Sequence, residues 1–141
     1  MSPVVRPDTK TLFHIDTQWF EENGRDLRAE LHAALCEKCR ALYPTPDDAR
    51  PVDRVHPQTG QVMRVDALWE CLADHCGQQA DFITPTMPLT RAIFRALLAN
   101  GNNPMSPEAL YQRIRKSTPT GILRVLMGAH IEDGIVPFQT P

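Results

Sequence analysis

The sequence predicts a mostly helical α+β protein, and three observations lead to this fold class. The chain has 141 residues with a hydrophobic content of 42% and a charged content of 23%, which is typical of a globular protein with one domain or two very small ones. Apolar residues recur at helical spacing in several segments, and only short segments alternate as strands do. Thirteen prolines against seven glycines favour many loops and sharply ended helices.

Charge and composition divide the chain into two expected parts, residues 1–84 and residues 85–141. The first part carries nine Lys/Arg and 14 Asp/Glu, a net charge of -5, and the second carries six and three, a net charge of +3. The proline-containing segment 83–88 between them has the composition of a short stiff connector. We therefore expect an acidic α+β part that holds all four cysteines, followed by a helical module.

The first part is predicted to begin with a short strand and a long helix. Apolar and polar residues alternate over residues 13–16, which indicates the strand. Leu27 and Leu31 then begin an apolar stripe at helical spacing that Pro44 ends. These signals predict a single helix over about residues 25–42.

A hairpin and a second helix follow in the first part. The alternating segments 52–56 and 61–65 flank a Pro-Gln-Thr-Gly turn, which predicts a β-hairpin. Asp66 is an expected N-cap, and Gly77 is the expected end of the helix that Asp66 begins.

Three helices and a small hairpin are predicted in the second part. The first helix is stopped at Gly101, and Ser106 and Thr118 each place an N-cap hydroxyl before a proline, which starts the second and third helices. An Asp-Gly turn predicts a hairpin over residues 131–136. This order of elements resembles the winged-helix fold over about residues 86–138. The resemblance implies a module that contacts DNA or another protein.

Two cysteine pairs predict a metal site. Cys36 and Cys39 form a C-x2-C pair, and after 31 intervening residues Cys71 and Cys76 form a C-x4-C pair. Zn²⁺ takes four soft or borderline donors in a tetrahedron, and a structural site leaves no position open. The spacing therefore predicts a structural zinc ion held by four thiolates.

At the second pair, the thiol of Cys76 and the imidazole of His75 compete to be the fourth ligand. In an unbroken helix the side chains of Cys71 and Cys76 would point about 140° apart, whereas Cys71 and His75 would align. Because Gly77 lets the last turn unwind, the four cysteines are the favoured set and His75 is the alternate ligand. His32 is a weaker reserve ligand.

The expected cellular compartment favours metal ligation or free thiols over disulfides for the four cysteines. The first ten residues are polar and interrupted by prolines, unlike a signal peptide, and no segment has the roughly 20 apolar residues needed to span a bilayer. We therefore expect a cytoplasmic protein without membrane contact, in a reducing environment. Unligated buried thiols, an iron–sulfur cluster and disulfides stay as alternatives, although the spacings match neither common ferredoxin pattern.

Five basic residues of the second part are candidate contacts for nucleic-acid phosphates. They lie on the first two expected helices of that part and are Arg91, Arg95, Arg113, Arg115 and Lys116. A solvated helix face explains them equally well. The third helix has Arg124 as its only charge, whereas a helix that reads bases needs several donors and acceptors. Its apolar surface favours burial in the core or beneath a partner.

The sequence predicts a binding protein and no enzyme. It contains no nucleophile elbow, phosphate-binding loop, zinc-protease motif or dinucleotide fingerprint, and no small-molecule substrate is evident. The favoured function is a zinc-stabilised adaptor or regulatory protein whose winged-helix-like module contacts a protein partner. The alternatives are a DNA-binding transcriptional regulator and a small iron–sulfur redox protein.

Overall fold

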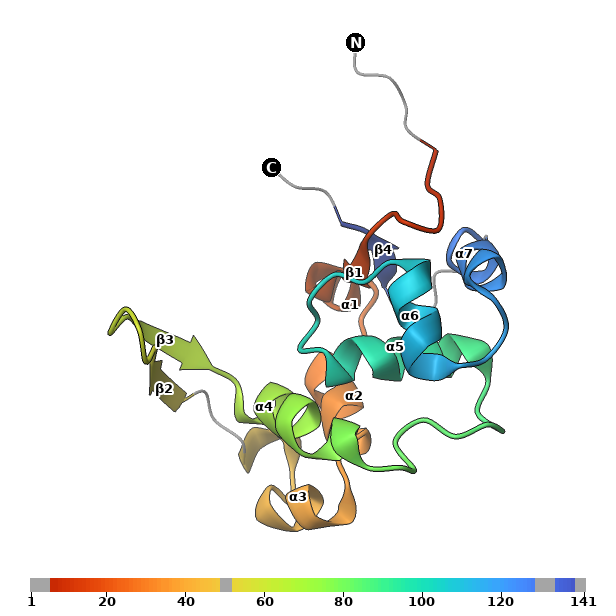
Figure 1. The fold of residues 1–141 in the computed structure, drawn as a ribbon. Coiled ribbons are helices and arrows are strands. Elements are labelled where there is room, and N and C mark those ends of the chain that lie inside the picture. Colours follow the sequence, from red (N-terminus) through yellow and green to blue (C-terminus); the bar gives the residue numbers. More distant parts are fainter. Residues whose placement is uncertain (1–5, 49–51, 129–133, 139–141) are drawn as a thin grey trace.

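The computed structural model describes residues 6–48, 52–128 and 134–138. These residues form seven α-helices, two short 3-10 helices and two two-stranded antiparallel sheets (Figure 1). The expected mostly helical α+β class is confirmed. Within the described ranges, every helix is too short or too polar to cross a membrane.

The N-terminal helical region differs from the prediction because it is divided into three short helices. After strand β1 (Phe13–Ile15), helix α1 (Thr17–Glu22), which the sequence analysis did not predict, begins at an Asp16 cap. The single helix predicted over residues 25–42 is wrong. The chain instead forms α2 (Leu27–Ala33) and α3 (Glu37–Leu42).

The break between α2 and α3 has a clear physical basis. Cys36 is extended, with φ -71° and ψ 167°, and it is the N-cap of α3. The guanidinium of Arg40 reaches back and donates to the carbonyls of Ala33 and Leu35, both at 3.0 Å. These bonds satisfy carbonyl groups that the end of α2 leaves without helical partners.

The predicted hairpin is confirmed as strands β2 (Val52–Val55) and β3 (Val62–Val65), which pair antiparallel and project away from the helices (Figure 1). A short 3-10 helix, η1 (Pro46–Asp48), precedes it. Helix α4 (Ala67–Asp74) follows it and begins at the predicted Asp66 cap.

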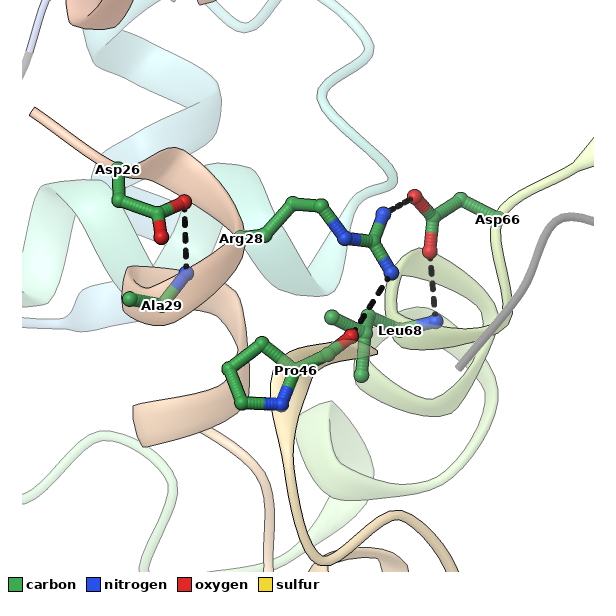
Figure 2. Close-up of polar contacts among 6 residues, drawn as sticks. All are labelled: Asp26, Arg28, Ala29, Pro46, Asp66 and Leu68. Carbon is green, nitrogen blue, oxygen red and sulfur yellow. Dashed lines mark hydrogen bonds and ion pairs between the residues drawn. The ribbon is translucent and has the colours of Figure 1, made fainter. Parts of the chain in front are cut away.

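The base of the hairpin is fastened to α2 by Arg28. Its guanidinium pairs with the carboxylate of Asp66 and also donates to the carbonyl of Pro46 at 3.2 Å (Figure 2). The other oxygen of Asp66 accepts from the Leu68 amide at 3.0 Å. Arg28 therefore links α2 to both ends of the segment that connects α3 with α4.

The three helices predicted in the second part are confirmed as α5 (Leu89–Ala99), α6 (Pro107–Ile114) and α7 (Pro119–Leu126). The cap hydroxyls of Ser106 and Thr118 accept from backbone amides three residues later. Helices α6 and α7 each have proline in the first turn, as the local sequence signals predict.

Strand β4 (Ile135–Pro137) pairs antiparallel with β1, so sequence-distant strands lie side by side (Figure 1). Residues 131–133 of the predicted hairpin lie outside the described residues. The winged-helix arrangement stays a prediction.

The other edge of β1 is paired by the segment before α6. Phe13 exchanges backbone hydrogen bonds with Met105 at 2.8 and 2.9 Å. The side chain of Asn102 accepts from the Ile15 amide at 2.8 Å and donates to the Ile15 carbonyl at 2.9 Å. The side chain of Asn102 thus forms the two hydrogen bonds with Ile15 that the backbone of a neighbouring strand would otherwise form.

One hydrophobic core contains residues from both sides of position 84. Phe20, Leu31 and Leu72 come from the first part, and Phe94 and Ile122 from the second. The division into parts at residues 1–84 and 85–141 stays a prediction.

Asn102 offers a test of how strongly the core depends on β1. Replacing it with glycine suits its φ of +61° but leaves two groups of Ile15 unpaired, which costs about 2 kcal/mol of unfolding free energy. Asn102→Ala is expected to cost about 1 kcal/mol more because alanine is strained at positive φ. Urea unfolding measures both values.

Asn103→Ala is the matched control, since among the described residues the Asn103 side chain bonds within its own turn, to the carbonyl of Asn100. Its expected cost is under about 1 kcal/mol. Equal unfolding free energies for Asn102→Gly and the parent chain would show that the side-chain pairing of β1 contributes nothing.

Candidate metal centre

Four potential metal ligands meet where α3 lies against the end of α4. Cys36 and Cys39 come from the first turn of α3, His75 follows α4, and Cys76 begins the 3-10 helix η2 (Cys76–Gln78). Their ligand atoms all lie within 4.8 Å of one another. This Cys3His cluster could hold a metal ion, because Cys3His is one of the usual ligand sets of structural zinc.

The end of α4 is shaped so that Cys76 can enter the cluster. The helix stops at Asp74, and His75 has φ -129° and ψ -66°, so the chain turns before Cys76 as the sequence analysis expected. A Cβ on Gly77 would lie 2.6 Å from the Cβ of Ala99 and 2.6 Å from the Leu72 carbonyl oxygen. Glycine is required here by close packing against α5.

Direct contacts join the two halves of the cluster. The Cys36 amide donates to the sulfur of Cys76 at 3.2 Å, and the sulfur of Cys36 lies 3.5 Å from Nδ1 of His75. Cys39 and Cys76 are buried, with 3% and 0% of their surface exposed, whereas Cys36 and His75 are half-buried. Two donors therefore lie in the interior and two near the surface.

The thiols are crowded in a way that a bound cation would relieve. Burial, together with neighbouring thiols, raises the pKa of Cys39 to about 11 and that of Cys76 to about 12. Burial also raises the pKa of Cys36, but hydrogen bonds from Cys39, Cys76 and Lys38 outweigh it, so the net shift is downward. A coordinated metal deprotonates thiols outright and compensates their charge.

Cys71, which the sequence analysis placed among the four ligands, lies beside this group of four. Burial raises the pKa of its thiol, and the neighbouring thiols of Cys36 and Cys76 add to the increase. His75, which the sequence analysis set as the alternate to Cys76, instead lies in the group together with Cys76. The reserve ligand His32 is engaged elsewhere, because its Nε2 lies 2.7 Å from the carbonyl oxygen of Tyr43.

Sequence reasoning missed the role of one residue that shapes the centre and one contact of another. Arg40 was not assigned a role, yet it holds the turn that presents Cys36. Gly77 was expected to end a helix, but its contact with Ala99 was not foreseen. Neither role leaves a local signal, since both depend on segments that meet only after folding.

Most of the candidate nucleic-acid contacts have partners within the chain. Arg95 donates to the Phe82 carbonyl at 3.0 Å, and Arg113 donates to the Gly77 carbonyl at 2.5 Å. Lys116 donates to the carbonyls of Pro85 and Met87.

The other two basic residues lie over aromatic rings. Arg91 is 3.5 Å from a Glu30 oxygen and lies over the ring of Phe94. Arg115, at the C-terminus of α6, lies over the ring of Tyr111. All five side chains thus contribute to the fold itself.

Comparisons with known proteins give no indication of function, so the function is inferred from the geometry of the cluster. No family model matches the chain, and neither the curated proteins nor the solved structures include a significant match.

Helix α3 is held to the rest of the molecule largely through the cluster. Cys39 is its only buried residue, and an isolated helix of six residues is not stable in water. We expect the amides of residues 37–42 to exchange rapidly in chelator-treated protein and slowly in zinc-loaded protein, while α5 stays protected in both. Hydrogen exchange with mass spectrometry measures this, and identical exchange in α3 with and without zinc would contradict it.

Proposed function

We propose that this protein is a non-enzymatic adaptor or regulatory protein stabilised by a structural zinc ion. The observation that carries the proposal is the Cys3His cluster, which joins the C-x2-C pair of α3 to the turn after α4. A metal there ties together two segments separated by a long loop and a hairpin. In a domain of this size such a tie adds substantially to stability.

The donor set favours zinc in a structural role. Four protein donors fill a tetrahedron and leave no position for a polarised water, which a catalytic zinc requires. Iron–sulfur clusters are usually held by four cysteines, so the presence of His75 in the group makes that alternative less favourable. We assign Cys36, Cys39, Cys76 and His75 as the ligands, with the four-cysteine set as the alternative.

The C-terminal helices are the proposed contact surface for a protein partner. In α7, Ile122 and Leu126 are buried, Met127 just beyond the helix has half of its surface exposed, and Arg124 is the only charge. The winged-helix resemblance is compatible with such a module. DNA binding is the less favourable alternative, since the basic side chains that would contact phosphates bind groups of the chain itself.

The metal proposal predicts how single substitutions affect zinc content. The parent chain should hold about one zinc ion, and Cys76→Ala should abolish binding because this buried thiol lies at the centre of the cluster. His75→Ala removes a donor and should weaken affinity by at least the roughly 10–100-fold that the loss of an outer-shell partner costs, and Cys71→Ser should retain the ion. Elemental analysis of untagged protein and a competition titration measure these values.

X-ray absorption at the zinc edge provides the control, with three sulfurs and one nitrogen expected around the ion. Loss of zinc in Cys71→Ser, with four sulfurs in the parent, would establish the four-cysteine set. Visible absorbance together with bound iron would show that the site holds an iron–sulfur cluster and no zinc ion. Metal-free protein with an unchanged melting temperature would refute the metal centre altogether.

Salt dependence separates the two kinds of partner. If the five basic residues bound duplex phosphates, log K would fall against log salt with a slope near -4.5, from about -0.9 per phosphate. We expect no such binding at physiological salt. We expect association with a protein partner to be nearly independent of salt and to lose about 2 kcal/mol in Met127→Ala. Tight DNA binding lost in Arg91→Ala/Arg95→Ala would reverse this assignment.

A further inference from the structure

The metal cluster is open on one side. An open groove of about 680 Å³ runs beside it and is lined by Cys36 and His75, whereas Cys39 and Cys76 do not line it. A groove of this volume is within the usual range for small-ligand sites. A molecule in the groove would therefore meet the two half-buried donors first.

His75 is held by few contacts outside the cluster. A metal-binding histidine almost always donates its second ring N–H to a carboxylate, a carbonyl or a water. In the part of the chain that the structure describes, the His75 ring has a hydrogen-bond contact only with the sulfur of Cys36. Its backbone lies at the irregular turn after α4, so no regular helix holds the side chain in place.

The groove presents charges of both signs near His75. Lys38 offers an ammonium group, Glu37 and Asp81 offer carboxylates, and Gln79 offers an amide. All four residues are exposed. Such a lining complements a small molecule that carries both a carboxylate and an ammonium group, as amino acids and short peptides do.

We propose that this groove binds a small zwitterionic thiol, which coordinates the metal in place of His75. This inference rests on the proposed metal centre. With a metal held by Cys36, Cys39 and Cys76, the thiol sulfur would bond to it in place of the His75 nitrogen, and the thiol proton would pass to the released imidazole. Three thiolates make the ion soft, so a fourth sulfur donor is preferred over a carboxylate.

Cobalt-substituted full-length protein allows a direct test with reduced glutathione as the probe. The parent chain should show a tetrahedral cobalt spectrum with three sulfur ligands, and glutathione should add sulfur-to-cobalt charge-transfer intensity that saturates. His75→Ala should bind glutathione about tenfold more tightly because no internal imidazole competes. Lys38→Ala should weaken binding several-fold, with Arg124→Ala as the control at a surface cation of α7.

S-methylglutathione is the ligand control, since it has the same charges but no thiol to donate. An equal response to this analogue, or no response to millimolar glutathione in both the parent and His75→Ala, would overturn the thiol site while leaving the metal centre intact. Cobalt recovered in the filtrate after glutathione addition would also overturn it, because the thiol would then strip the metal. Failure of the parent chain to bind tetrahedral cobalt would overturn both proposals.

Discussion

The close contact between Gly77 and Ala99 is the constraint on which the metal centre depends. With no side chain at position 77, the turn after α4 lies directly on α5, and Cys76 is carried into the interior. The carbonyl of the same glycine accepts from Arg113 of α6. One backbone position therefore connects the helices of the second part with the sulfur cluster of the first, and the cluster's geometry is set by the core.

A second set of contacts joins the parts through β1. This strand is paired on one side by β4 and on the other by Met105 and the side chain of Asn102. Its inward residues, Phe13 and Ile15, are fully buried. The acidic residues 1–84 and the basic residues 85–141 thus share both a sheet and a core. Their difference in charge lies in surface residues, because no charged residue is buried in the described part of the chain.

The elements predicted correctly are those with local causes. The caps at Ser106 and Thr118 and the alternation around the β2–β3 turn act within a few residues, so a sequence pattern contains them. The break before Cys36 does not follow from such a pattern. The apolar stripe continues through Leu35 and Cys39, so it gives no sign of a break. The chain turns at Cys36, which is the N-cap of α3 and whose amide donates to the sulfur of Cys76.

The choice between His75 and Cys71 as the fourth member has the same origin. The cysteine spacing predicted a site in this region, and the helix geometry set His75 against Cys76 for one position, whereas the structure groups both of them with Cys36 and Cys39. The outcome depends on where α4 ends, and that is set by the contact of Gly77 with Ala99, the last residue of α5, 22 residues further along the chain. Periodicity alone contains no such information.

The pairing of β1 with β4 also has a consequence for the order of folding. Phe13 and Pro137 are partners, and closing a loop of roughly 120 residues costs about 1 kcal/mol more entropy than closing the roughly 40-residue loop between Cys36 and Cys76. This difference favours assembly of the sulfur cluster and the α2–α5 core before the sheet closes. In that order, the edge of β1 that β4 covers stays open until the last closure, and an open strand edge can pair with another chain.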